Sequence, residues 1–195
     1  MYCCQPKGDI VVNKKTLNVA LALIAACMIA GCGAPQQGSV KKILAEELPA
    51  LGHRNWILIV DSAYPAQSRP AIRTVTTTAD QVELVRTVLK EIDSTNHITP
   101  KIYLDAELKY VGEDDAPGIN AYRSKLGEAL VGHSVKSISH EELIAKVDEA
   151  AKTFRVLILK TPLTLPYTSV FLELDCGYWT PQKEQNMRRA IQQAN

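Results

Sequence analysis

After residue 31, the longest apolar stretch of the chain is a run of five residues at 56–60, with no polar residue alternating within it. The run is too short to cross a membrane and rich in β-branched residues, so it predicts a buried strand. Asp61 stands where this strand ends, and Tyr64-Pro65 turns the chain away. Such a strand, covered on both faces, belongs at the centre of a sheet.

Other segments follow the periodicities of strands and helices. Runs of β-branched or apolar residues predict strands at 72–77, 101–104, 135–138, 154–159 and 170–174. Apolar residues at helical spacing predict helices before Pro49, after Thr78, after Pro117 and after Ser139, and a polar helical tail at 181–195. Thr78 with Gln81, and Ser139 with Glu142, have capping-box spacing. We expect Tyr178 and Trp179 to pack beneath the tail.

Strands alternating with helices predict an α/β domain with three α/β/α layers and a largely parallel, mixed sheet. With 195 residues, 46% of them apolar and 22% charged, the chain can form one globular domain with a proper core. The formal net charge of +1 gives no sign of a nucleic-acid partner. Without its first 31 residues the net charge of the chain is near −1.

The N-terminal segment has the pattern of an export signal. Two lysines precede an apolar run at 17–30, which is shorter than the roughly 20 residues that span a bilayer. The run ends in Ile29-Ala30-Gly31-Cys32, which resembles the lipobox of bacterial lipoproteins, where the cysteine is lipidated and becomes the mature N-terminus. The alternative is a plain signal peptide with an incidental cysteine. The long segment before the run also leaves open a start at Val11 or Val12.

These features divide the chain into four parts. Residues 1–31 are a predicted lipoprotein signal peptide, 32–40 a flexible tether, 41–180 the folded domain and 181–195 a helical tail. We therefore expect an exported protein that is held on the bacterial cell envelope by a lipid on Cys32. Of five cysteines only Cys176 then remains in the domain, so no internal disulfide forms despite the export. No Cys or His cluster has the spacing of metal ligands.

Two predicted element boundaries carry candidate chemistry. In open α/β sheets ligands bind beyond the carboxyl ends of strands, where Asp61 is placed. The alternative is that Asp61 only forms a turn and that His53, before the strand, is a surface residue. His140 falls on the first residue of a predicted helix, where the helix dipole favours a neutral imidazole that can donate and accept hydrogen bonds. That suits a hydroxyl-rich ligand, although an ordinary exposed histidine is the alternative.

Three separated motifs resemble the D-ribose pyranase and L-fucose mutarotase (RbsD/FucU) family, in the right order. The first is Leu-Gly-His, an apolar strand and Asp-Ala-x-x-Pro, matched by residues 51–65 with Ser62 and Ala63 after the aspartate. The second is a histidine at a strand-to-helix junction, matched by His140. The third is Pro-Tyr-x-Asn before a strand, where Tyr167 matches and Ser169 replaces the asparagine. Residues 105–109 are weakly similar to an acidic segment in the middle of the family's sequences.

The resemblance covers about residues 44–177 and implies a function. It implies a mutarotase or pyranase that interconverts the cyclic forms of a free ribose- or fucose-like sugar, without a metal or nucleotide cofactor. It also implies that His53 transfers the proton, that Asp61 orients His53 or binds a sugar hydroxyl, and that His140, Tyr167 and Ser169 bind hydroxyls. A homo-oligomer with sites at subunit boundaries is implied as well.

Two further readings use the same fold. Serine in place of asparagine at position 169 removes an amide that can both donate and accept at longer reach. A sugar-binding protein without turnover is therefore one alternative. A scaffold lipoprotein is the other, because the family usually works in the cytoplasm and a lipid anchor is unexpected there.

Overall fold

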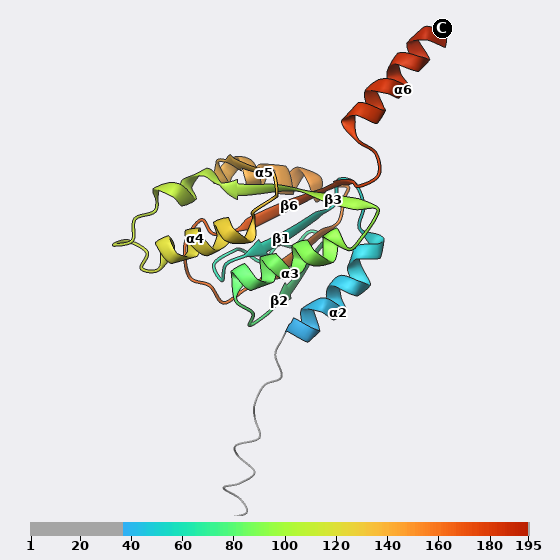
Figure 1. The fold of residues 1–195 in the computed structure, drawn as a ribbon. Coiled ribbons are helices and arrows are strands. Elements are labelled where there is room, and N and C mark those ends of the chain that lie inside the picture. The colour runs from blue at the N-terminus through green and yellow to red at the C-terminus, as the bar shows by residue number, and fades with distance from the viewer. Residues whose placement is uncertain (1–36, 195) are drawn as a thin grey trace, which may run out of the picture. The chain divides into compact units, whose positions relative to one another are not determined.

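The computed structural model describes residues 37–194, and these form a six-stranded sheet with helices on both faces (Figure 1). The strands are β1 (Trp56–Val60), β2 (Ile72–Thr76), β3 (Ile98–Asp105), β4 (Val135–Ile138), β5 (Val156–Lys160) and β6 (Val170–Cys176). The helices are α2 (Gln37–Glu47), α3 (Gln81–Asp93), α4 (Ile119–Ala129), α5 (His140–Ala150) and α6 (Pro181–Ala194), with short 3-10 turns η1 (Leu48–Ala50) and η2 (Ala106–Tyr110). The predicted α/β class is confirmed.

The order of the strands is β2-β5-β1-β6-β3-β4. β1 is parallel to β5, β5 to β2, and β3 to β4, whereas β6 runs antiparallel to both of its neighbours, β1 and β3. The sheet is therefore mixed and largely parallel, as predicted. Because β6 alone is reversed, the carboxyl ends of the other five strands and the amino end of β6 lie at the same end of the sheet. This end, where the strands terminate, is called here the carboxyl edge, and the opposite end is called the amino edge.

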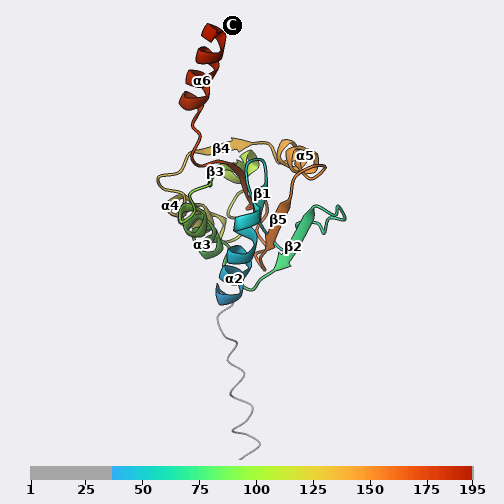
Figure 2. The same ribbon diagram turned by 90° about the vertical axis from the view of Figure 1, so that its right-hand side faces the viewer.

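β1 is the central strand that its sequence predicts, and all five of its residues are buried. Its side chains alternate between two cores, because successive residues of a strand point to opposite faces. Ile57 and Ile59 belong to the core beneath α2, α3 and α4. Trp56, Leu58 and Val60 belong to the core beneath α5. Figure 2 shows α5 across the sheet from α3 and α4.

The start of α3 differs from the prediction. Its N-cap is Asp80, whose Oδ1 accepts hydrogen bonds from the backbone of Val82 and Glu83. Gln81 serves the core instead of a capping box. Its buried amide nitrogen donates to the Tyr122 hydroxyl and its amide oxygen accepts from Thr161. A buried amide requires such partners, and this requirement fixes its role.

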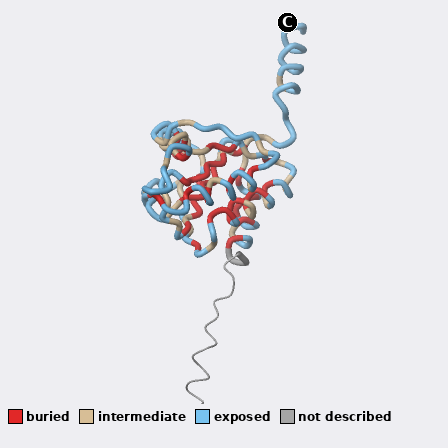
Figure 3. The backbone as a smooth tube through the Cα atoms, turned by 60° about the vertical axis from the view of Figure 1, so that its left-hand side comes forward, coloured by how far each residue is buried: buried red, intermediate tan, exposed pale blue. Residues whose placement is uncertain are grey.

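In the predicted tail the structure has the helix α6 (Pro181–Ala194), which buries no residue and is almost entirely exposed (Figure 3). The expectation that Tyr178 and Trp179 pack beneath it is wrong, because these side chains are 65% and 43% exposed. Trp179 Nε1 instead donates to Glu184 Oε2 at 2.8 Å, and the residue stays partly exposed to solvent.

Several predictions fall on residues before 37 and so lie outside the described part of the chain. They are the signal peptide at 1–31, the tether at 32–36 and the lipid on Cys32. The last four residues of the predicted tether, 37–40, instead begin α2, and Val40 is buried. Among residues 37–194, no helix is both long enough and apolar enough to cross a membrane. Cys176 is the only cysteine in this part of the chain, and its thiol is free.

Candidate functional site

Polar side chains gather at the carboxyl edge of the sheet, where five strands end and β6 begins. The register explains which of them meet. Val170, the first residue of β6, pairs with Ile59 of β1 on one side and with Leu104 of β3 on the other. Asp61 and Asp105 therefore lie on either side of Ser169, with neighbouring strands about 4.8 Å apart.

Asp61 has one contact that builds a turn and one that belongs to the edge cluster. Its Oδ1 accepts a hydrogen bond from the Ala63 backbone at 2.7 Å, which is an Asx turn. Its Oδ2 accepts a hydrogen bond from Ser169 Oγ at 3.3 Å. The two interpretations of Asp61, as a turn former and as a site residue, are thus compatible.

His140 begins α5 and is held from two directions. Its Nδ1 lies 2.9 Å from Oδ1 of Asp105, the last residue of β3. Its backbone N–H donates to both carboxylate oxygens of Glu107, at 3.0 and 3.1 Å. Ser139 caps the helix as predicted, since its Oγ accepts from the Glu142 backbone at 3.3 Å. The start of α5 is therefore fixed on the end of β3.

Tyr167 completes this group through an unusual backbone conformation. Its φ is +56°, and only one other non-glycine residue of residues 37–194, Arg54, has a positive φ. Bulky side chains rarely adopt this region, and such residues concentrate at functional sites. The ring of Tyr167 meets the His140 imidazole edge to face, with 5.7 Å between ring centroids. Tyr167 is 41% exposed, so a ligand can reach it.

Asp105 has the most unusual environment in the cluster. Its side chain is fully buried, and its Oδ2 has no hydrogen-bond partner among the described residues. Burial raises the pKa of Asp105, because a carboxylate loses its hydration there. The hydrogen bond and charge of His140 act in the opposite direction, and the charges of Glu107 and Asp61 raise the pKa further.

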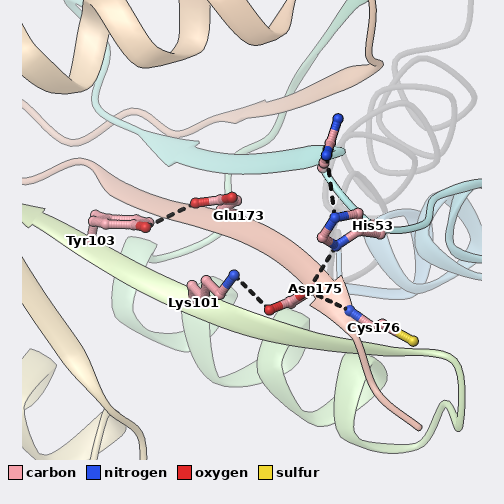
Figure 4. Close-up of polar contacts among 7 residues, drawn as sticks. His53, Lys101, Tyr103, Glu173, Asp175 and Cys176 are labelled. Atoms are coloured by element: carbon pink, nitrogen blue, oxygen red, sulfur yellow. Dashed lines mark hydrogen bonds and ion pairs between the residues drawn. The ribbon is translucent and has the colours of Figure 1, made fainter. Parts of the chain in front are cut away.

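His53 lies at the other edge of the sheet, before β1 begins. β1 has five residues, so its ends are separated by about 16 Å at about 3.3 Å per residue. His53 Nδ1 donates to Asp175 Oδ1 at 2.7 Å, and its Nε2 accepts from Arg54 Nε at 3.3 Å (Figure 4). The second oxygen of Asp175 lies 2.5 Å from Lys101 Nζ.

Asp175 is a well-partnered carboxylate, in contrast to Asp105. Burial alone would raise its pKa, but hydrogen bonds from Lys101, from the Cys176 backbone and from His53 together lower it. His53, Asp175 and Lys101 thus form a network of one hydrogen bond and one ion pair at the protein surface. It contacts none of the side chains that gather at the carboxyl edge.

The structure therefore brings together four of the five residues that sequence reasoning assigned to sugar chemistry. Asp61, His140, Tyr167 and Ser169 share the carboxyl edge. His53 does not reach them within one chain.

Two hollows lie near these groups. One of about 220 Å³ has Asp105 in its wall and is otherwise mostly apolar, with Leu108, Leu126 and Leu130 among its lining residues. A larger, open one of about 720 Å³ lies at the amino edge and includes His53, Asp175 and Trp179. Its size does not mark it as the site, because it opens widely to solvent and lies away from the cluster. Among residues 37–194, no group of three His, Cys, Asp or Glu side chains is arranged to hold a metal ion.

Sequence reasoning missed the roles of Asp105 and Glu107, although it singled out their segment. A usable signal was present. Asp105 follows the apolar strand residues at 102–104 just as Asp61 follows β1, and carboxyl ends of parallel strands meet at one edge. The pairing with His140 was not visible, because it depends on β3 and β4 being neighbours.

Comparison with known proteins places the chain in a family. Residues 36–177 match the RbsD / FucU transport protein family, and the chain belongs to this family. No curated protein sequence gives a significant match to the chain.

The solved structures to which the chain is similar include RbsD from Bacillus subtilis complexed with D-ribose and the fucose mutarotase from Streptococcus pneumoniae in complex with L-fucose. RbsD is 20% identical, with 68% of this chain and 90% of that chain covered and a TM-score of 0.48. The mutarotase is 19% identical, with 74% and 97% covered and a TM-score of 0.47. FucU from Bifidobacterium longum is 17% identical, with 73% and 98% covered and a TM-score of 0.45.

Proposed function

We propose that this protein binds a free monosaccharide of the ribose or fucose type at the carboxyl edge and interconverts its cyclic forms. The observation that carries the proposal is the convergence of Asp61, His140, Tyr167 and Ser169, which come from three separate segments, in a member of this family. These side chains offer carboxylate, imidazole and hydroxyl groups, which suit the many hydroxyls of a sugar.

The reaction needs two proton transfers. Opening a cyclic hemiacetal requires a base at the anomeric hydroxyl and an acid at the ring oxygen, and positioned groups of this kind accelerate a reaction by about 10²–10⁴-fold. We assign the binding of sugar hydroxyls to Asp61, His140, Tyr167 and Ser169. Transfer of a proton is assigned to His53.

The position of His53 gives this assignment a geometric condition. Because His53 lies at the opposite end of β1, it can act only if a second copy of the chain places its own His53 over the carboxyl edge. We therefore propose a homo-oligomer with sites at the boundaries between copies. The exposure of His140 and Tyr167, about two fifths of each side chain, leaves the edge open to such a neighbour.

A binding protein without turnover is the second candidate, and Ser169 favours it. The Ser169 hydroxyl already donates a hydrogen bond to Asp61. The serine side chain is also shorter than the asparagine side chain of the family motif. A sugar held with fewer contacts at this position can bind without reaching the geometry of ring opening.

Nuclear magnetic resonance separates the two candidates. Saturation transfer on ribose, fucose and related free sugars measures exchange between ring forms, and titration calorimetry measures binding. We expect the wild type to show both, and His53→Ala to lower exchange by about 10²-fold with binding largely kept. His133→Ala is the matched control, because His133 lies in the loop between α4 and β4 and makes no hydrogen bond to either His–Asp pair.

The outcomes are distinct. Binding without exchange above the spontaneous rate supports the binding protein, and Ser169→Asn then tests whether the family's amide restores turnover. A wild-type protein that shows neither binding nor exchange across a broad panel of aldoses would refute both candidates. The scaffold lipoprotein would then remain.

We further propose that the protein is exported and anchored on the cell envelope by a lipid on Cys32. Support comes from the sequence Ile29-Ala30-Gly31-Cys32 after an apolar run of signal length. The anchor would hold the domain where free sugars pass the membrane.

A further inference from the structure

We propose that Asp105 is a positioning residue that holds the His140 imidazole in one tautomer, so that His140 is the base at the anomeric hydroxyl. The inference deepens the proposed function and rests on it. It assigns a role to a buried carboxylate that the binding of sugar hydroxyls does not use.

The first argument is the hydrogen bond between the two side chains. An ionised carboxylate only accepts hydrogen bonds, so Asp105 Oδ1, 2.9 Å from His140 Nδ1, requires the proton of a neutral imidazole to be on Nδ1. The lone pair then lies on Nε2. Among the described residues His140 Nε2 has no hydrogen-bond partner, and the side chain is 38% exposed, so a ligand hydroxyl can reach it.

The second argument is that the imidazole is held in place before a ligand arrives. Glu107 accepts the backbone N–H of His140 with both oxygens, and the Tyr167 ring lies against the imidazole. Asp105 itself is anchored as the last residue of β3, with a fully buried side chain. A base that is fixed in orientation loses little entropy when the substrate binds.

The third argument is electrostatic. Two carboxylates contact His140, Asp105 at Nδ1 and Glu107 at the backbone N–H, and their negative charges stabilise the positive charge that develops as the imidazole accepts a proton. Asp105 is buried with one oxygen unpartnered, so its charge is poorly stabilised until an imidazolium stands beside it. The stabilisation therefore increases as the proton moves, which is the condition for catalysis.

The chain contains a second His–Asp pair, and the comparison favours His140 as the base. His53 also has Nδ1 on a carboxylate, but its Nε2 accepts a hydrogen bond from Arg54. The lone pair that a base needs is occupied there by a cation. Asp175 is shared with Lys101, which neutralises part of its charge. To act as the acid instead, His53 of a second copy must carry a proton on Nε2, which requires the Arg54 guanidinium to move away from that nitrogen.

The proton balance of ring opening then follows. His140 Nε2 takes the proton of the anomeric hydroxyl, the bond between the anomeric carbon and the ring oxygen breaks, and the carbonyl forms. The ring oxygen leaves with the electron pair of that bond and receives a proton from His53 of a second copy. Ring closure on the other face, or through another hydroxyl, reverses both transfers and restores both histidines.

The test is Asp105→Asn in the full-length protein, with Asp93→Asn, an exposed position at the end of α3, as the matched control. The first readout is the tautomer of His140 from nitrogen chemical shifts at pH 8, assigned by comparison with His140→Asn. We expect a proton on Nδ1 in the wild type and in Asp93→Asn. In Asp105→Asn the side-chain amide can donate to Nδ1, so the proton should move to Nε2.

The second readout is sugar exchange, which should fall by about 10²-fold in Asp105→Asn and stay unchanged in Asp93→Asn. An unchanged tautomer in Asp105→Asn, or wild-type exchange in that variant, would overturn the inference. A wild type without exchange on any sugar refutes the proposed turnover instead, and the tautomer measurement still decides whether Asp105 positions His140.

Discussion

At the scale of single residues, Asp105 combines a functional position with an unfavourable environment. Its carboxylate is buried, one oxygen lacks a partner in the described part of the chain, and its pKa is raised by burial. A raised pKa in the folded state means that folding favours the protonated carboxyl. The resulting stabilisation is fully present below the pKa of the unfolded chain and is lost as pH rises through the folded pKa. Ionised Asp105 therefore lowers stability at neutral pH.

This predicts that Asp105→Asn stabilises the fold while it lowers sugar exchange. At pH 8, where an ordinary imidazole is neutral, the free energy of unfolding should rise by about 1 kcal/mol, since the amide carries no charge to bury. The gain should shrink as pH falls through the raised pKa of Asp105. Urea denaturation between pH 8 and 5 measures both effects, with Asp93→Asn as the control. A variant that is less stable than the wild type at pH 8 would show that ionised Asp105 stabilises the fold.

The residues of the site differ in how far the sequence could predict them. Asp61 and His140 were predictable, because each stands at an element boundary that periodicity reveals. The contact between Asp105 and His140 was not. It arises because Asp105 pairs with Ile138 in the β3–β4 ladder, across 33 residues of chain, and strand neighbours are not encoded by local pattern. The left-handed backbone of Tyr167 likewise results from its tertiary surroundings.

At the scale of elements, β1 separates the two cores and connects the two edges. We predict that Ile59→Asp abolishes soluble expression, because Ile59 is fully buried beneath α3 and an aspartate there would be an unpaired buried charge. Val131→Asp is the matched control, since Val131 is 79% exposed and the same charge should be tolerated. Fractionation of cell lysates measures the result. A soluble, cooperatively folding Ile59→Asp protein would contradict the buried position of this strand.

The start of α5 is the element that carries His140, and its cap should matter for stability. Ser139→Ala removes the acceptor of the Glu142 backbone N–H and should lower the free energy of unfolding by about 1 kcal/mol. Thr180→Ala removes the equivalent acceptor before α6, where Oγ1 accepts from the Lys183 backbone at 3.3 Å. Because α6 buries no residue, that change should leave global unfolding unaffected. Equal losses in both variants would mean that α6 belongs to the cooperative unit.

Element types were largely predictable here, and the errors have physical causes. The buried strands and amphipathic helices follow from periodicity, whereas the true cap of α3 does not. Asp80 and Thr78 are both good capping residues, and the choice between them was made by Gln81, whose amide is drawn into the core by Tyr122 and Thr161. The exposure of Trp179 was not predicted, because large aromatic side chains are usually buried in a folded domain.

At the scale of the whole molecule, the two His–Asp pairs lie at opposite edges of one sheet. One chain therefore presents an acid candidate at the amino edge and a base candidate at the carboxyl edge, separated by about the length of β1. The proposed site is complete only between copies. The sequence pattern already implied this separation, because His53 precedes and Asp61 follows the predicted strand at 56–60, so the two residues lie at opposite ends of it.

The last prediction concerns the tether between the domain and the membrane. If Cys32 carries a lipid, metabolic labelling with a fatty-acid probe should mark the wild type and leave Cys32→Ala unlabelled. The reason is chemical, because the thiol of the first mature residue is the group that is lipidated. Cys176→Ala is the matched control, since its thiol lies in the folded domain and should not affect labelling. Cell fractionation should then find the wild type and Cys176→Ala with membranes and Cys32→Ala released from them. Equal labelling of the wild type and Cys32→Ala would mean that the cysteine at position 32 is incidental.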